Sequence, residues 1–370
     1  MTRATVLAPL DTTGVQRALE AAIGDAVVGA LIRVDDHHSG TWIATAGSAQ
    51  AGRRVPVAAG GAFRIGSITK TFVATVVLQL VGDGAIGLDD SVQRHLPGVL
   101  PSGYPPIAVR DLLQHTSGVP NYLPEVLSGP DRILANRTRT WAPEQLVALA
   151  TAHPRAFEPG TALGYSNTNY VLLGMLVRAV TGHWWGTEVH RRIARPLELT
   201  STYAPGDDLT LPVPHARGYL TLISRGRREL VDITDYPMSV TDAAGSMTST
   251  ARDLNAFLGA LLGGELLPAT LLEQMLEPSD KGPLLGVAGW GLGILELPLP
   301  GCGGRPVYGD GGGIHGYVCL AFATRDAHRR VTVSLNTADN DPTSQTQTLI
   351  GIAEVAFCGG ATAPGPTGKL

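Results

Sequence analysis

The stretch Phe63-Arg64-Ile65-Gly66-Ser67-Ile68-Thr69-Lys70 opens an apolar run that continues to Val81 and ends at Gly82-Asp83-Gly84. This run predicts a long buried helix that begins near Ser67. Ser67 and Lys70 are three residues apart, so on a helix they share one face about one turn apart. In a first helical turn, unpaired N–H groups and the helix dipole favour an alkoxide and disfavour a protonated lysine. The pair therefore suits a serine nucleophile with a lysine base, although the same spacing also occurs by chance on protein surfaces.

A tyrosine and an asparagine form a second candidate motif, Tyr165-Ser166-Asn167. A phenol beside a lysine can carry a proton to a leaving group, and an amide can hold both the lysine and a substrate carbonyl. Taken alone, these residues also fit a core tyrosine and an asparagine that caps a helix.

A glycine-rich run, Tyr308-Gly309-Asp310-Gly311-Gly312-Gly313-Ile314-His315-Gly316, leads into a strand-like segment at 316–323. Glycines let a backbone approach a ligand closely, so Gly312 and Gly313 are candidates for substrate contact. The backbone N–H of Gly313 can join that of Ser67 in an oxyanion hole. The run also matches the pattern GxGxxG, but a strand rather than a helix follows it and no βαβ unit surrounds it, which argues against a dinucleotide site.

Hydrophobic periodicity divides the rest of the chain into helices and strands. We expect strands at 27–34, 41–46, 289–295, 316–323 and 330–335, and helices at 15–23, 109–113, 143–152, 169–180, 188–194, 251–262 and 344–357. Loops rich in proline and glycine separate the helices of the middle segment. We therefore predict a mainly helical lobe at 85–239, inserted between residues 1–84 and 240–358 of an α/β sandwich lobe, and a disordered tail at 359–370.

The composition is that of an ordinary globular protein, with 44% hydrophobic and 16% charged residues in a chain of 370. The formal net charge of −4 and the lack of a basic run argue against a nucleic-acid partner. No apolar stretch approaches the ~20 residues that a membrane span needs, and the N-terminus lacks the apolar core of a signal peptide. We expect a cytoplasmic protein that binds neither nucleic acid nor membrane.

The cysteines and histidines form no pattern typical of a metal site. Cys302, Cys319 and Cys358 are an odd number without paired spacing, so we predict neither a disulfide framework nor a CxxC site. We interpret Cys319 as a small core residue. His183 and His190 lack the HExxH spacing of a zinc site. We therefore expect no metal and no other cofactor.

In their order and spacing, Ser67-x-x-Lys70, Tyr165-x-Asn167 and the glycine-rich run resemble the motifs of the penicillin-recognising serine hydrolases. That family includes class C β-lactamases, DD-carboxypeptidases, D-aminopeptidases and β-lactamase-like esterases. Segments 109–118 and 196–199 also resemble it, so the resemblance covers nearly the whole chain. It implies an α+β fold of the β-lactamase/transpeptidase-like type, in which an antiparallel sheet flanked by helices meets an all-α lobe and the site lies between them.

The resemblance also implies a role for each matching residue. Ser67 would be the nucleophile, Lys70 its base or proton relay, and Tyr165 the general acid or base for the leaving group. Asn167 would steady Lys70 and the substrate. The backbone N–H groups of Ser67 and Gly313 would form the oxyanion hole.

Asp310 departs from the family pattern, in which a lysine or histidine at this position helps to grip a substrate carboxylate. A carboxylate here would repel a substrate acid by about 1 to 4 kcal/mol at 4 Å. This disfavours a penicillin or a peptide with a free C-terminal carboxylate, and it favours a neutral ester, an amide or an amine-bearing substrate. His315 could supply the missing base only if the glycines bulge, because strand alternation places it on the opposite face.

We therefore predict a serine hydrolase or acyltransferase, including a biosynthetic transacylase, that forms an acyl-enzyme on Ser67. The acyl donor would be a small molecule or short peptide carrying an ester, an amide or a D-amino acid, and the acceptor would be water, an amine or an alcohol. A DD-carboxypeptidase or class C β-lactamase is an alternative, and so is a non-catalytic relative that captures a ligand without turnover. The intact set of Ser67, Lys70, Tyr165 and Asn167 speaks against the last of these.

Overall fold

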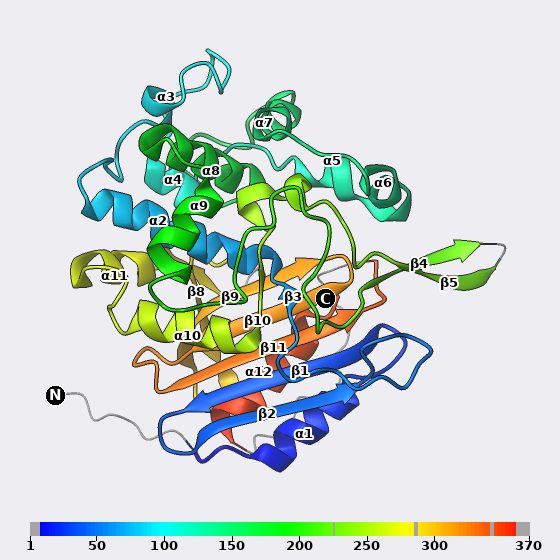
Figure 1. Ribbon diagram of the computed structural model, residues 1–370. Helices are drawn as coiled ribbons and strands as arrows, with labels where there is room; N and C mark the ends of the chain where they lie inside the picture. Colours follow the sequence, from blue (N-terminus) through cyan, green and yellow to red (C-terminus); the bar gives the residue numbers. More distant parts are fainter. Residues whose placement is uncertain (1–7, 225, 285–287, 341–343, 360–370) are drawn as a thin grey trace.

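A computed structural model describes residues 8–224, 226–284, 288–340 and 344–359 (Figure 1). At its centre lies a seven-stranded antiparallel sheet with the strand order β2-β1-β11-β10-β9-β8-β7. Its strands are β1 (Val27–Asp36), β2 (Gly40–Gly47), β7 (Gly289–Trp290), β8 (Leu295–Leu299), β9 (Arg305–Ile314), β10 (Tyr317–Ala323) and β11 (Arg329–Thr337). Two smaller antiparallel pairs are β3 (Phe63–Arg64) with β6 (Thr248–Ser249), and β4 (Tyr219–Ser224) with β5 (Arg227–Asp232).

Helices surround this sheet and fill the space beyond one of its faces (Figure 1). The α-helices are α1 (Thr12–Ala21), α2 (Thr69–Gly82), α3 (Val92–His95), α4 (Val109–Leu113), α5 (Leu123–Leu127), α6 (Gly129–Asn136), α7 (Pro143–Thr151), α8 (Asn167–Thr181), α9 (Trp185–Val189), α10 (Ala251–Leu262), α11 (Ala269–Leu276) and α12 (Thr346–Cys358). Short 3₁₀ turns are η1 (Gly66–Ile68), η3 (Met238–Val240), η4 (Asp242–Ala244) and η5 (Pro300–Cys302), and η2 (His190–Ala194) is a π-helical turn.

The sheet is covered on both faces (Figure 1). On one face, α1 and α12 pack over a core that includes Val15, Val333 and Phe357. On the other face, α10 packs against β10 and β11, and Cys319 and Ala321 of β10 point into the larger core around α2. This is the α+β, β-lactamase/transpeptidase-like fold that the resemblance implies.

Helix α2 is the buried helix that the sequence predicts, and the 3₁₀ turn η1 precedes it without a break. Eleven of its 14 residues are buried. A helix that is apolar on all sides belongs in the interior of a protein rather than on its surface. The ring of Phe72 stacks on that of Phe257 of α10 with 3.8 Å between the centroids. The side chain of Lys70 therefore lies inside the protein.

Several elements differ from those expected. The run expected as one strand at 289–295 contains only β7 and the first residue of β8, and these two strands pair with each other. The glycine-rich run is itself strand β9, although glycine is a poor strand former, because β8 and β10 pair with it on both sides. The hairpin β4–β5 lies in the segment expected to be mainly helical, and Figure 1 shows it projecting from the molecule. Helix α11 was not predicted from the sequence.

The prediction for the cysteines is wrong for one pair: Cys302 and Cys358 form a disulfide. Their Cα atoms are 5.0 Å apart, within the usual range for a disulfide, although 56 positions separate them in the sequence. Packing of η5 against α12 brings them together, and no sequence spacing could show this contact. Cys319 is free and buried, as predicted.

No helix in the described ranges is long and apolar enough to cross a membrane. Residues 1–7, at the start of the stretch considered above for a signal peptide, lie outside the described residues. So do residues 360–370 of the tail that we expect to be disordered.

Candidate active site

Three oxygen atoms surround the Lys70 amine at the head of α2. Nζ lies 2.9 Å from Oγ of Ser67, 2.9 Å from Oδ1 of Asn167 and 2.6 Å from the backbone oxygen of Ala244. Lys70 is 0% exposed, whereas Ser67 is partly exposed. The predicted Ser-x-x-Lys motif is therefore one hydrogen-bonded unit in which Ser67 is accessible to solvent and Lys70 is not.

Burial favours the uncharged form of the Lys70 amine. It lowers the pKa of Lys70 to about 7, and the Asp310 carboxyl partly opposes this change. The oxygens of Ala244 and Asn167 can only accept hydrogen bonds, so two N–H bonds of Lys70 are directed at them. In the uncharged amine, the single lone pair then faces the hydroxyl of Ser67. This geometry lets Lys70 accept the proton of Ser67.

Tyr165 contacts the same hydroxyl from the other side. Its Oη lies 2.7 Å from Oγ of Ser67, and Nζ of Lys70 lies 4.9 Å from the centre of its ring. Burial raises the pKa of Tyr165 well above its ordinary value, so the phenol holds its proton at neutral pH. Tyr165 can therefore donate a hydrogen bond or a proton to a group bound beside Ser67.

Asn121 orients Asn167, a contact that sequence patterns do not predict. Oδ1 of Asn121 accepts hydrogen bonds from the backbone N–H and from Nδ2 of Asn167, at 3.1 and 3.3 Å. Because Nδ2 donates to Asn121, Oδ1 of Asn167 is the atom that faces Lys70. Asn121 sits in the loop between α4 and α5, and no motif marks it.

His115 supports Tyr165 from behind, although the sequence pattern predicts no chemical role for it. It lies just after α4 with a φ of 60°, and its ring centre is 4.5 Å from that of Tyr165. Nδ1 accepts a hydrogen bond from the backbone N–H of Ser166 at 3.3 Å and faces Nδ2 of Asn169 at 3.1 Å. Burial holds the pKa of His115 well below its usual range, so the ring is an uncharged support.

The glycines of β9 allow this strand to touch the backbone at the start of α2. A Cβ added to Gly312 would lie 1.8 Å from the backbone oxygen of Ile65, and one added to Gly66 would lie 2.8 Å from the backbone nitrogen of Gly313. Gly66 also has a φ of 49°, which favours glycine. The close approach places the amide of Gly313 alongside the first turn that contains Ser67, where backbone N–H groups lack helical partners.

The structure places Asp310 beneath the surface of the site. Its side chain is 3% exposed, its Oδ1 accepts a 2.8 Å hydrogen bond from the backbone N–H of Gly311, and no described residue donates to Oδ2. Burial raises its pKa to about 8, with Lys70 opposing the change. Asp310 is therefore a buried acid whose surroundings favour the protonated form, rather than the exposed carboxylate on which the predicted repulsion of substrate acids depends.

His315 lies in the turn between β9 and β10, not beside Lys70 in the hydrogen-bonded unit. It lines a small hollow together with Arg64, Tyr236 and Ile314. The described hydrogen bonds of Lys70 thus involve Ser67, Asn167 and Ala244, none of which is a histidine.

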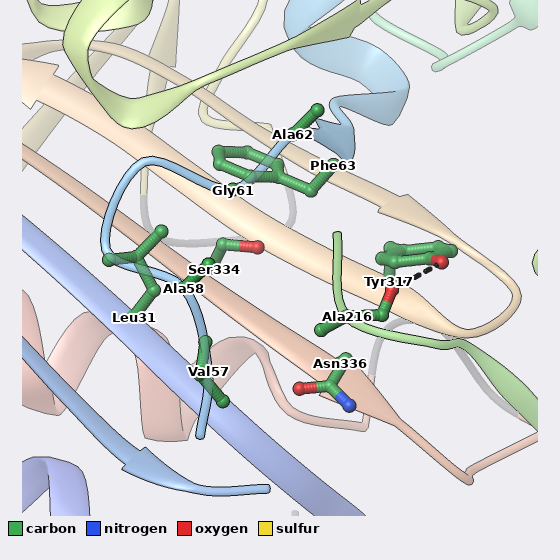
Figure 2. A pocket seen from close by; sticks show the side chains of 10 residues that line it. All are labelled: Leu31, Val57, Ala58, Gly61, Ala62, Phe63, Ala216, Tyr317, Ser334 and Asn336. Carbon is green, nitrogen blue, oxygen red and sulfur yellow. Dashed lines mark hydrogen bonds between the residues drawn. The ribbon is translucent and has the colours of Figure 1, made fainter. Parts of the chain in front are cut away.

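A separate cavity of about 20 Å³ lies between the segment 57–63 and the sheet, and Figure 2 shows the ten side chains around it. Tyr317 closes one end, where its hydroxyl donates to the backbone oxygen of Ala216 at 2.8 Å. Neither Ser67 nor Lys70 lines this cavity. Its volume suits about one water molecule, so it is a packing defect and not a substrate site.

Comparison with known proteins shows the family and the fold of this chain. The profile of the Beta-lactamase family matches residues 16–355 of the chain. The D-stereospecific amidohydrolase from Streptomyces sp. superposes with a TM-score of 0.84 at 40% identity, over 95% of this chain and 100% of its own. The D-amino acid amidase from Ochrobactrum anthropi SV3, in complex with L-phenylalanine amide, superposes with a TM-score of 0.77 at 29% identity, over 92% of this chain and 95% of its own. Esterase EstB from Burkholderia gladioli is 28% identical, over 89% of this chain and 92% of the esterase.

Proposed function

Because the chain belongs to the Beta-lactamase family and is a serine hydrolase, we propose that Ser67 carries the acyl group during turnover. One observation carries the proposal above all others: the buried Lys70 amine, with its lowered pKa, lies 2.9 Å from Oγ of Ser67. A serine hydroxyl becomes a useful nucleophile when a nearby base can take its proton, and an uncharged lysine is such a base.

In the acylation step, Oγ of Ser67 attacks the carbonyl carbon of the substrate while its proton passes to Nζ of Lys70. The backbone N–H groups of Ser67 and Gly313 stabilise the oxyanion. When the intermediate collapses, the bond from carbon to the leaving nitrogen or oxygen breaks and Tyr165 donates a proton to the leaving atom. Lys70 then returns a proton to the phenol, which restores both side chains. The 2.7 Å contact between Tyr165 and Ser67 supports the donation of a proton by the phenol to an atom bound beside Ser67.

In the second step, water attacks the ester carbonyl on Ser67 and gives a proton to Lys70. When the bond between the carbonyl carbon and Oγ of Ser67 breaks, the acid is released and Lys70 passes its proton to Oγ. An amine or alcohol in place of water would yield a new amide or ester by the same sequence of steps. Because the site holds Lys70 as a base in both steps, the protein needs no other general base.

We propose that the acyl donor is an amide or ester, including those of D-amino acids, without a free carboxylate next to the scissile bond. The similar amidohydrolase, amidase and esterase support this class of substrate. Position 310 supports it too, because the buried acid there supplies no cation to a substrate carboxylate. A carboxypeptidase or a β-lactamase would need such a cation from elsewhere.

The test is a matched pair of peptides ending in D-Ala-D-Ala, one with a free carboxylate and one with a C-terminal amide, assayed beside D- and L-phenylalanine amide and p-nitrophenyl acetate. We expect the amide-ended peptide to be cleaved faster than its acid, and D-phenylalanine amide faster than its enantiomer, with the Ser67→Ala variant inactive throughout. Faster cleavage of the free acid, or a β-lactam as the best substrate, would support the carboxypeptidase or β-lactamase alternative. Adding an amine to the same assays measures the share of acyl transfer.

A further inference from the structure

Asp310 is a buried acid with one oxygen left without a hydrogen bond. Strand β9 holds its side chain on the face of the sheet that looks towards α2, since Asp310 pairs with Ala321 of the larger core. Oδ1 receives one backbone N–H, and Oδ2 receives none from any described residue, although the side chain is 3% exposed. An isolated carboxylate is far more costly to bury than a protonated carboxyl. This environment therefore favours the protonated form.

The neighbours of Asp310 include the residues of the proposed acylation step. Five titratable side chains lie near one another here, from α2, the turn after α4, the segment that leads into α8, α8 itself and β10. They are Lys70, His115, Tyr165, Tyr170 and Cys319. Burial raises the pKa of both tyrosines and of the cysteine far above neutrality, and it lowers that of the histidine. Lys70 and Asp310 are thus the two groups of this cluster that change protonation near neutral pH.

The charge of Asp310 bears on Lys70 and on Ser67. A carboxylate at this position would stabilise the ammonium form of Lys70 and so oppose its use as a base. It would also repel the negative charge that develops on the oxyanion when Ser67 attacks. A protonated carboxyl has neither effect.

Resting on the proposed function of Ser67 and Lys70, we propose that Asp310 is a positioning residue that must keep its proton during turnover. The site then works only in the pH interval in which Lys70 has lost its proton and Asp310 has not. Below this interval the ammonium of Lys70 cannot accept a proton from Ser67. Above it, the carboxylate of Asp310 opposes acylation.

The experiment compares kcat/KM across pH for the full chain, its Asp310→Asn variant and Asp326→Asn, which removes an acid from the remote turn between β10 and β11. We expect wild type and Asp326→Asn to give a bell-shaped profile. At one pH unit above the apparent pKa of the falling limb, kcat/KM should be about tenfold below its maximum, as expected for the loss of a single essential proton. Asp310→Asn should lose the falling limb, and its rising limb should stay in place because Asp310 is still uncharged at the pH at which Lys70 loses its proton.

A falling limb that persists unchanged in Asp310→Asn would overturn the proposal. Activity that persists in Ser67→Ala would instead reject the proposed function, so the two failures are distinguishable. Infrared spectroscopy of the wild-type protein provides a second measurement that does not need the variant to fold. A protonated carboxyl band should disappear with the same midpoint as the falling limb, and the absence of such a band would contradict the proposal.

Discussion

At the scale of single residues, the proposed chemistry depends on the position of one amine. Nζ of Lys70 has three oxygen neighbours and no solvent, and this burial is the main cause of its lowered pKa. An ordinary surface lysine would be charged at neutral pH and could not act as a base. The chemistry therefore follows from where α2 places Lys70 as much as from the residue type.

Replacing Lys70 by methionine tests this dependence. Methionine fills similar space without a base, so we expect kcat to fall by about 10²- to 10⁴-fold with little change in KM. Lys281→Met removes an exposed lysine and serves as the matched control. Steady-state kinetics with an amide substrate measures the effect, and a kcat within a few-fold of wild type would exclude Lys70 as the base.

The Tyr165→Phe variant separates support from proton donation. The phenylalanine ring should keep the contact with His115, while the hydroxyl near Ser67 is lost. An amide leaving group needs a proton, whereas p-nitrophenolate does not. We expect kcat/KM for the amide to fall by about 10²- to 10⁴-fold, and by a much smaller factor for p-nitrophenyl acetate. Equal losses for both substrates would contradict the role of Tyr165 as the acid.

At the scale of elements, the site depends on the contact between β9 and the turn η1. Gly312 tests it, because an added methyl group would lie 1.8 Å from the backbone oxygen of Ile65 and must push the strand away from Ser67. Gly311 next to it is the control, since its added methyl group would have no neighbour closer than 3.8 Å. We expect Gly312→Ala to lose most of its kcat and Gly311→Ala to keep it.

Both variants should be compared by thermal unfolding as well as by kinetics. A folded Gly312→Ala with wild-type kcat would show that the close approach of β9 to η1 is not needed for the oxyanion hole.

Elements with a clear hydrophobic period were predictable from the sequence, and those fixed by pairing were not. Helix α10 matches its prediction of 251–262, and α2 follows from a strongly apolar run. Strand β9 has no such period, because its glycines serve the close contact with η1. In the hairpin β4–β5 only Tyr219 and Leu220 are buried and the other residues of the two strands are partly or fully exposed, so it shows no alternating buried face that a pattern could reveal.

At the scale of the whole molecule, the disulfide joins two parts of the chain that are distant in sequence. Cys358 ends α12, and Cys302 lies in η5 between β8 and β9. Closing a loop of this length limits the freedom of the unfolded chain and is expected to add about 2 to 4 kcal/mol to the free energy of unfolding. Neither cysteine belongs to the site.

We therefore expect Cys302→Ser to unfold at lower urea concentration than wild type and to keep its kcat at 25 °C. Wild type treated with a reductant should resemble the variant, and the double variant Cys302→Ser/Cys358→Ser should lose no further stability. An unchanged unfolding midpoint would mean that the bond contributes nothing to stability.

The residues of the proposed active site lie in motifs that the sequence shows, whereas the groups that support them do not. Ser67, Lys70, Tyr165 and Asn167 lie in motifs, and the structure brings all four together. The carbonyl of Ala244, the amide of Asn121 and the burial of Asp310 depend on segments that meet only in the folded chain. Backbone groups and buried environments leave no trace in residue spacing.

The most direct test of the account is to locate the acyl group. The protein is mixed with p-nitrophenyl acetate, quenched during the burst and digested, and the peptide that gains an acetyl group is identified by mass spectrometry. We predict an acetyl ester on the peptide containing Ser67, and no such ester in Ser67→Ala. Acetylation of another residue only, or release of nitrophenol by Ser67→Ala at the wild-type rate, would contradict the account.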